Sequence, residues 1–187
     1  MASSVASICN RALTFLGANR ISSIDDDSVE AKLCKEHYED TLCDLLRSHP
    51  WKFAIARATL GLLTTTPEYE WDYQYQLPSD CLRVVGMEGH ESDDWTVEGN
   101  YLLTNYGEAK IKYIKKVTTV GLFDPNFTTV LALDLAILIS YSITTSQGLR
   151  KDLIELRDDK IKEARTYSAQ EAVGNRVYAD EWLNSRY

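Results

Sequence analysis

The sequence has few of the residues on which enzymes and secreted domains depend. Only three of its 187 residues are histidine and four are cysteine, and no two cysteines have CxxC spacing. A phosphate-binding glycine loop, an HExxH motif and a GxSxG motif are all missing. We therefore expect neither an enzyme nor a protein with a metal or cofactor. The cysteines are expected to be small core residues of a protein made in a reducing cytoplasm.

The three histidines are weak candidates for chemistry. Cys34 and His37 lie three residues apart on a predicted helix, close enough to touch, but no third group is indicated that would orient the imidazole. His49 falls at a helix end, where an imidazole can satisfy free carbonyls. His90 lies next to Glu91 and could bind a metal weakly, although a solvated acidic loop is the commoner structure.

A secretory signal is also missing, because the first twenty residues have neither a basic start nor a long apolar run. The longest apolar stretch, residues 130–143, contains Asp134 and Ser140 and is about one turn short of a bilayer span. We expect a soluble protein in which this stretch is a buried helix.

Basic residues are scarce in one segment. Residues 66–108 contain ten acidic residues and a single basic one, Arg83. The net charge of the whole chain is −8, so this segment holds the entire acidic excess. Duplex DNA is therefore not expected to be gripped there, because phosphate binding needs Lys and Arg. The candidate basic patch is the lysine group that follows. This group is Lys110, Lys112, Lys115 and Lys116. Lys110 and Lys112 lie on the same face of a predicted strand, but a solvated strand face gives the same pattern.

Apolar residues recur at helical spacing in four segments. Glycines follow the first and third segments, and the third is apolar nearly all round, so it should be the central helix with Leu135 and Leu138 buried. The predicted helices are residues 4–16, ended by Gly17; 28–48, ended by Pro50; 130–147, ended by Gly148; and about 149–164.

Between these helices the pattern changes to strand alternation. Aromatic residues alternate with polar ones around Tyr73, a hairpin is indicated at Gly99, and residues 110–114 alternate again. We expect a mainly α, α+β fold: a helical bundle of about four helices with one small inserted antiparallel β-sheet. Residues 1–65 and 109–168 should form the bundle, and 66–108 an inserted acidic β lobe whose last strand lies near 110–114.

Residues 169–187 have no sustained period but keep large apolar side chains. A solvated tail normally lacks aromatic residues, so this segment is expected to be covered by something. We expect a docking arm that orders on a partner through Val177, Tyr178, Trp182, Leu183 and Tyr187. The alternative is that the arm packs back on its own bundle.

Four phrases in the chain, taken in order, resemble the head-to-tail adaptor (tail tubular protein A) family of short-tailed bacteriophages. The resemblance covers about residues 8–165, and the order and spacing of the phrases are more specific than any one of them. The phrases are ICNRALTFLGANRISS (8–23), CKEHYEDTLCDLLRSHPWKFA (34–54), YQYQLPSDCLRV (73–84) and LFDPNFTTVLALDLAILISYSIT (122–144).

The resemblance implies a structural virion protein of the tail or neck. It implies a ring of twelve copies beneath the portal, a tail nozzle docking below, and DNA passing through the lumen. The C-terminal arm would then meet the portal, and Glu91, Asp93 and Asp94 of the acidic lobe would face the channel or the nozzle. A small nucleic-acid-binding phage regulatory protein is the alternative, because the lysine group could form a basic face.

Overall fold

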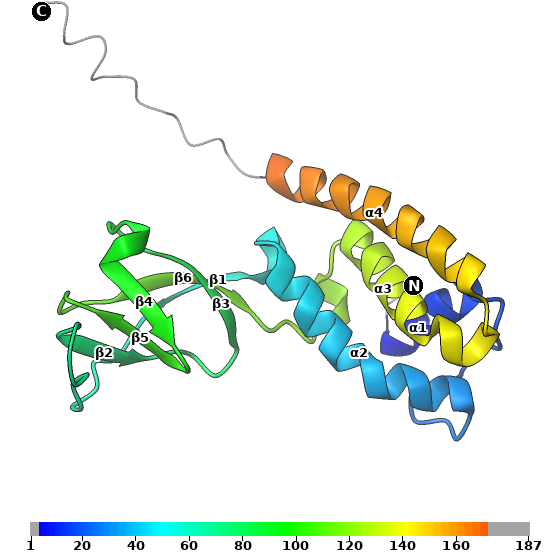
Figure 1. The fold of residues 1–187 in the computed structure, drawn as a ribbon, viewed down its shortest axis with the longest axis horizontal. Coiled ribbons are helices and arrows are strands. Elements are labelled where there is room, and N and C mark those ends of the chain that lie inside the picture. The colour runs from blue at the N-terminus through cyan, green and yellow to red at the C-terminus, as the bar shows by residue number, and fades with distance from the viewer. Residues whose placement is uncertain (1–3, 172–187) are drawn as a thin grey trace, which may run out of the picture.

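The computed structural model describes residues 4–171, which form a helical lobe and a β lobe lying end to end (Figure 1). The helical lobe contains α1 (Val5–Phe15), α2 (Val29–Ser48), α3 (Pro125–Thr144) and α4 (Gln147–Gln170). The β lobe contains β1 (Ile55–Thr59), β2 (Tyr73–Gln76), β3 (Cys81–Met87), β4 (Trp95–Glu98), β5 (Tyr101–Thr104) and β6 (Lys110–Lys115).

Local capping chemistry sets most of the helix ends. The Ser4 hydroxyl accepts a hydrogen bond from the amide of Ser7 at the start of α1, and Gly17 follows the helix at φ +66°, which favours glycine. The Ser28 hydroxyl starts α2 in the same way. Asp124 caps α3 by accepting from two amides, and Pro125 takes the first helical position, where no amide hydrogen is needed.

The third helix ends earlier than the sequence indicated. It stops at Thr144, and Thr145 follows in the left-handed region at φ 52°. Gly148 lies inside the first turn of α4, whose start is capped by the hydroxyl of Ser146. The expected end at Gly148 is therefore wrong. The Ser146 hydroxyl accepts a hydrogen bond from the amide of Leu149, and this cap outweighs the cost of a glycine in the first turn of α4.

α3 is the central helix of the helical lobe, since α1, α2 and α4 all pack on it. By length and apolar composition alone α3 could cross a membrane, and half of that stretch is buried inside the protein. Leu135 is fully buried, as expected, but Leu138 is 49% exposed, so its predicted burial is wrong. The neighbouring helices cover one side of α3 and leave the other partly open.

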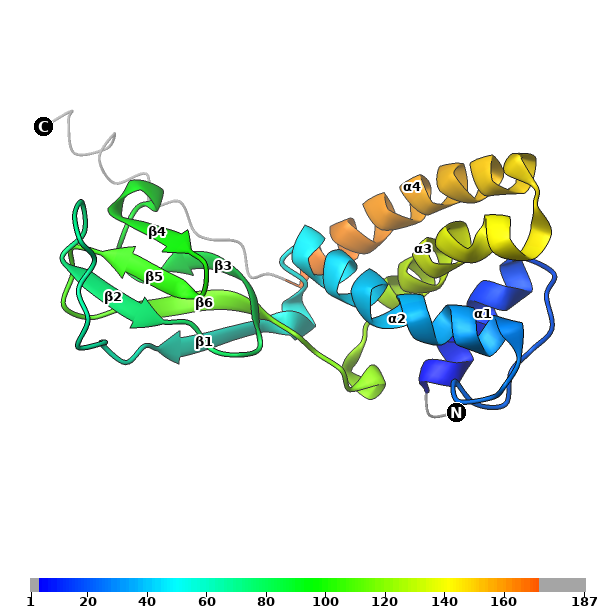
Figure 2. The ribbon, with the colours of Figure 1, turned by 60° about the horizontal axis from the view of Figure 1, so that its bottom comes forward.

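The expectation of a helical bundle with one inserted sheet is also wrong. The described residues are 50% helical and 18% strand, and the strands form two three-stranded antiparallel sheets, ordered β1-β6-β3 and β2-β5-β4 (Figure 2). β1 lies within residues 1–65, which were assigned to the bundle, and pairs along its length with β6. No local pattern reveals this pairing, because the paired residues are about fifty positions apart in the chain.

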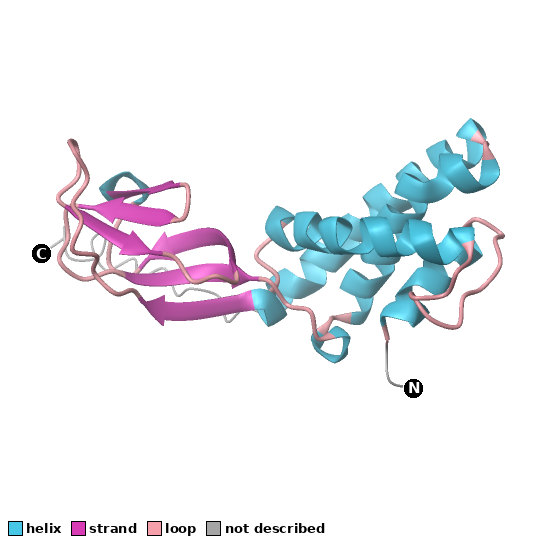
Figure 3. Cartoon of the chain, turned by 90° about the horizontal axis from the view of Figure 1, so that it is seen from below, coloured by secondary structure: helices cyan, strands magenta, loops and turns pink. Residues whose placement is uncertain are grey.

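Each lobe has an apolar core of its own, and helices and strands are segregated along the long axis (Figure 3). The β-lobe core lies between the two sheets and includes Tyr75, Leu102 and Ile111. At the junction, Trp51 is buried against Phe127 with ring centroids 5.1 Å apart, and its indole N–H donates to the carbonyl of Leu45. This contact fixes the end of α2 to the start of α3, next to the point where the chain enters β1.

Candidate binding surfaces

The acidic residues expected to meet a partner lie in a loop between β3 and β4, which we call the acidic loop (Glu91–Asp94). It contains a single turn of 3-10 helix, Ser92–Asp94. Glu91 and Asp93 are exposed, as a partner contact requires. Asp94 is half-buried and takes part in contacts within its own chain.

Three neighbouring groups surround the carboxylate of Asp94. It accepts a hydrogen bond from the amide of Glu91 at 2.9 Å and one from the Tyr106 hydroxyl at 3.3 Å. His90 Nδ1 lies 3.8 Å from the same carboxylate, and the His90 ring packs on Tyr106 with centroids 3.8 Å apart. The negative charge of Asp94 raises the pKa of Tyr106, because it opposes ionisation of the phenol. Asp94 therefore holds the loop in shape, and the exposed charge belongs to Glu91 and Asp93.

Three lysines of the candidate basic patch, Lys110, Lys112 and Lys116, have different partners in the structure. Lys110 forms an ion pair with Glu108 at 2.9 Å, and Lys116 pairs with Glu39 of α2, so both have acidic partners. Lys112 is directly opposite Arg57 of β1 in the sheet register. Within residues 4–171 neither Arg57 nor Lys112 has a salt-bridge partner.

Arg57 and Lys112 line an open groove of about 510 Å³ on the sheet β1-β6-β3, which we call the β groove. Glu88 and Lys110 also line it, so the groove has a modest positive excess. Sequence patterns did not reveal Arg57 as a functional candidate, because its partner in the sheet comes from a distant strand. A like-charged pair directly opposite in a sheet lowers its stability, which an anionic ligand would offset.

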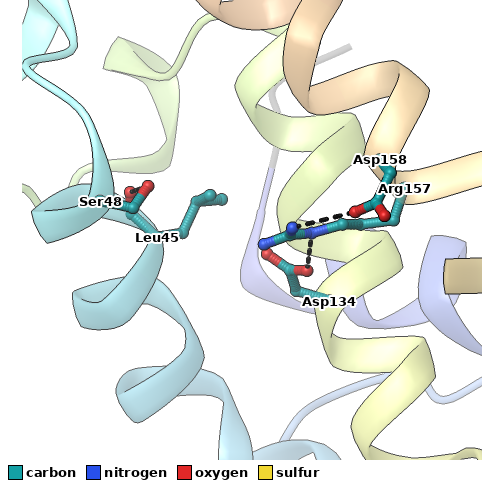
Figure 4. Close-up of polar contacts among 5 residues, drawn as sticks. All are labelled: Leu45, Ser48, Asp134, Arg157 and Asp158. Atoms are coloured by element: carbon teal, nitrogen blue, oxygen red, sulfur yellow. Dashed lines mark hydrogen bonds and ion pairs between the residues drawn. The ribbon is translucent and has the colours of Figure 1, made fainter.

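A second groove lies on the helical lobe between α2 and α4, and we call it the helical groove. Figure 4 shows Leu45 and Ser48 of α2 on one side and Arg157 of α4 on the other, with α3 between them. The groove encloses about 280 Å³, and Leu138 forms part of its lining. Tyr141, one turn further along α3 and 57% exposed, continues the same apolar face.

An ion pair forms part of the lining of the helical groove. Arg157 Nε donates to the Asp134 carboxylate at 2.7 Å, and the guanidinium also reaches Asp158 on its own helix (Figure 4). The side chain of Asp134 is 18% exposed and that of Arg157 is 31% exposed. Desolvation raises the pKa of Asp134 even though Arg157 opposes the shift. The pair accounts for the charge that interrupts the apolar sequence of α3.

Cys34 and His49 both pack within the helical lobe. Cys34 and Cys9 are buried in the same core, where the neighbouring Cys34 and burial both raise the pKa of the Cys9 thiol. His49 follows the last turn of α2, where its ring packs edge-on against Trp51, and desolvation lowers its pKa. Within residues 4–171 no three His, Cys, Asp or Glu side chains gather to hold a metal.

The residues expected to contact the portal, Val177, Tyr178, Trp182, Leu183 and Tyr187, lie outside the described residues. Comparison with protein-family models found no match to the chain, and comparison with curated proteins found none either.

Proposed function

We propose that this chain is a structural subunit of a virus particle: a ring-forming head-to-tail adaptor between the portal and the tail nozzle of a short-tailed phage. Twelve copies would surround the channel through which DNA passes without sequence-specific binding. The observation that carries the proposal is the division of each subunit into two lobes with separate cores, laid end to end (Figure 1). Such a subunit presents different surfaces to two partners along one axis.

The placement of the four family-like phrases supports the same proposal. The first covers α1 and the turn after it, and the second covers most of α2 and the junction at Trp51. The third runs from β2 into β3, and the fourth supplies the cap and body of α3. All four phrases therefore fall on elements that build the two lobes and their junction.

The exposed charges of the acidic loop suit a channel-side role for this part of the β lobe. Glu91 and Asp93 carry negative charge at the acidic loop, and a channel wall of that sign repels phosphates and so lets DNA slide. Because Asp94 is engaged within the loop, only two of the three expected acidic residues contribute to this role.

The second candidate function is a nucleic-acid-binding regulator. It is favoured by one observation, the juxtaposition of Arg57 and Lys112 in the β groove without acidic partners among residues 4–171. Glu88 in the same groove and the acidic excess of residues 66–108 oppose phosphate binding, since they repel the ligand at long range. The adaptor is therefore the better-supported proposal.

Electron microscopy of the purified full chain, alone and with the portal, separates the two functions. The adaptor proposal expects closed rings, and particles in which rings cap the portal. Monomers that shift a DNA band at physiological salt would contradict it and support the regulator.

A charge-reversal pair makes the distinction sharper. Arg57→Glu with Lys112→Glu should abolish a band shift that depends on the β groove but leave ring formation unchanged. Lys32→Glu with Lys35→Glu, both exposed on α2, is the matched control for the change in net charge.

A further inference from the structure

The helical groove leaves an apolar face of the central helix without cover. Leu138 and Tyr141 are half exposed, although the rest of α3 supplies most of the core of the helical lobe. Ile154 of α4 is 40% exposed and, by helical spacing, lies on the same side as Arg150 and Arg157, which line the groove. Exposed apolar side chains arranged along a groove are typical of a site that binds an amphipathic segment.

We propose that residues 172–187 of this chain fold back in the isolated subunit and dock in the helical groove. This inference does not depend on the adaptor function. The segment has the composition that the groove requires, because Tyr178, Trp182 and Leu183 are large and apolar. Trp and Tyr side chains contribute most to binding energy when they fill such sites.

Residues 172–187 begin where α4 ends, at the junction end of the helical groove. The amide of Lys52 donates to the Ser168 hydroxyl at 3.3 Å, so α4 ends beside the junction, next to the C-terminal end of α2. α2 and α4 therefore both approach the junction with their C-terminal ends, and the groove between them extends away from it. A chain that leaves Glu171 and reverses direction runs along this groove.

The length of the segment matches the groove. Arg157 and Arg150 lie about 21 and 32 Å back from Glu171 along α4, at 1.5 Å for each helical residue. Tyr178 and Trp182 lie about 23 and 36 Å beyond Glu171 in an extended chain, at 3.3 Å for each residue. Arg157 pairs with Asp134, so Leu138 and Tyr141, further along α3, lie between the levels of Tyr178 and Trp182.

Complementary charge is confined to the α4 side of the groove, because Asp44 lines the α2 side. Arg150 lines the α4 side of the groove and forms no salt bridge within the described part of the chain. Asp180 and Glu181 immediately precede Trp182, so docking Trp182 brings negative charge close to Arg150. A partner that binds the same residues, as the portal would, must first displace the segment from the groove.

Tryptic cleavage after Arg176 in the full-length protein tests the proposal. Docking should protect this bond. Leu138→Glu should raise the initial cleavage rate at least about ten-fold, which corresponds to a loss of about 1.4 kcal/mol in the free energy of docking. Trp182→Ala should have the same effect from the other side of the contact. Leu122→Glu, at a 57% exposed site that does not line the groove, is the matched control and should cleave like the wild type.

Circular dichroism spectra should be the same for all four proteins, because both replaced leucines are half exposed. Equal cleavage of the wild type and Leu138→Glu would overturn the proposal. So would protection that disappears on dilution, because a second copy would then occupy the groove. Ring formation in the microscope is a separate measurement, so failure here leaves the adaptor proposal standing.

Discussion

Two adjacent aspartates in the acidic loop have different roles. Asp93 is exposed, and in the described structure its carboxylate accepts a hydrogen bond only from its neighbour Ser92. Asp94 accepts from the backbone of Glu91 and from Tyr106, so it links both ends of the loop to β5 and its following turn. Sequence alone gives both residues the same expectation, because the contact of Asp94 with Tyr106 forms only when the chain has turned back through β4 and β5.

Asp94→Ala should therefore lower the free energy of unfolding by about 1 kcal/mol, because it removes two hydrogen bonds at a half-exposed site. Asp93→Ala should change it by less than about 0.5 kcal/mol, as exposed substitutions do. Denaturant unfolding of the two single variants measures the difference. Equal midpoints would mean that Asp94 does not stabilise the loop.

Because of the ion pair between Asp134 and Arg157, we expect the stability of an Arg157 variant to depend on pH. Burial already raises the pKa of Asp134, and Arg157→Met removes the positive charge that limits the rise. In the variant, the contribution of the protonated carboxyl to stability is fully present below its unfolded pKa and is lost as pH rises through the folded one.

Arg157→Met should thus cost about 2 kcal/mol at pH 7, less than a fully buried pair would, because both side chains keep some contact with water. The difference in free energy of unfolding between the variant and the wild type should become smaller as the pH is lowered to 4. Thermal or denaturant unfolding at both pH values gives the result. A gap that widens on acidification would show that the sign is wrong. Lys160→Met, which removes a more exposed ion pair on the same helix, is the control.

At the scale of the element, α3 shows that an apolar sequence does not determine which of its sides is covered. Leu135 and Leu138 lie three residues apart, and both were expected in the core. The structure buries Leu135 between neighbouring helices and places Leu138 in the helical groove.

This difference gives a matched pair of truncations. Leu135→Ala should cost about 2–5 kcal/mol, because it removes buried apolar atoms and leaves a cavity. Leu138→Ala should cost less than this, since residues 4–171 leave half of the side chain uncovered. The two denaturant midpoints should therefore differ clearly, and similar midpoints would contradict the assigned orientation of α3.

For the whole molecule, two separate cores imply two units of local stability. Leu102 is fully buried in the β-lobe core, and Leu131 is fully buried in the core of the helical lobe. The two lobes meet at Trp51 and at Ile114 of β6, which belongs to the helical core, whereas the other buried residues of each core come from its own lobe or its junction.

Leu102→Ala should speed amide hydrogen exchange in β2, β4 and β5 and leave exchange in the middle of α3 close to that of the wild type. Leu131→Ala is the reciprocal variant and should speed exchange in the helices. Mass spectrometry of peptic fragments distinguishes the two patterns. Uniform acceleration by both variants would mean that the lobes unfold as one unit.

Local chemistry in the sequence determined much of the helical lobe. Ser4, Gly17 and Ser28 mark helix ends by capping, which depends only on residues within one turn. The predicted start of the third helix at residue 130 was too late, because Asp124 caps α3 and Pro125 is its first residue. The hairpin between β4 and β5 follows equally local chemistry, because Gly99 adopts φ +58° at its turn.

Only the tertiary structure decided the features on which the binding surfaces depend. The pairing of β1 with β6 divides the strands into two sheets and places Arg57 opposite Lys112. The placement of α2 and α4 around α3 leaves Leu138 in an open groove. These outcomes depend on contacts between residues far apart in the chain, and the periodicity of a single segment carries no information about which distant element will cover it.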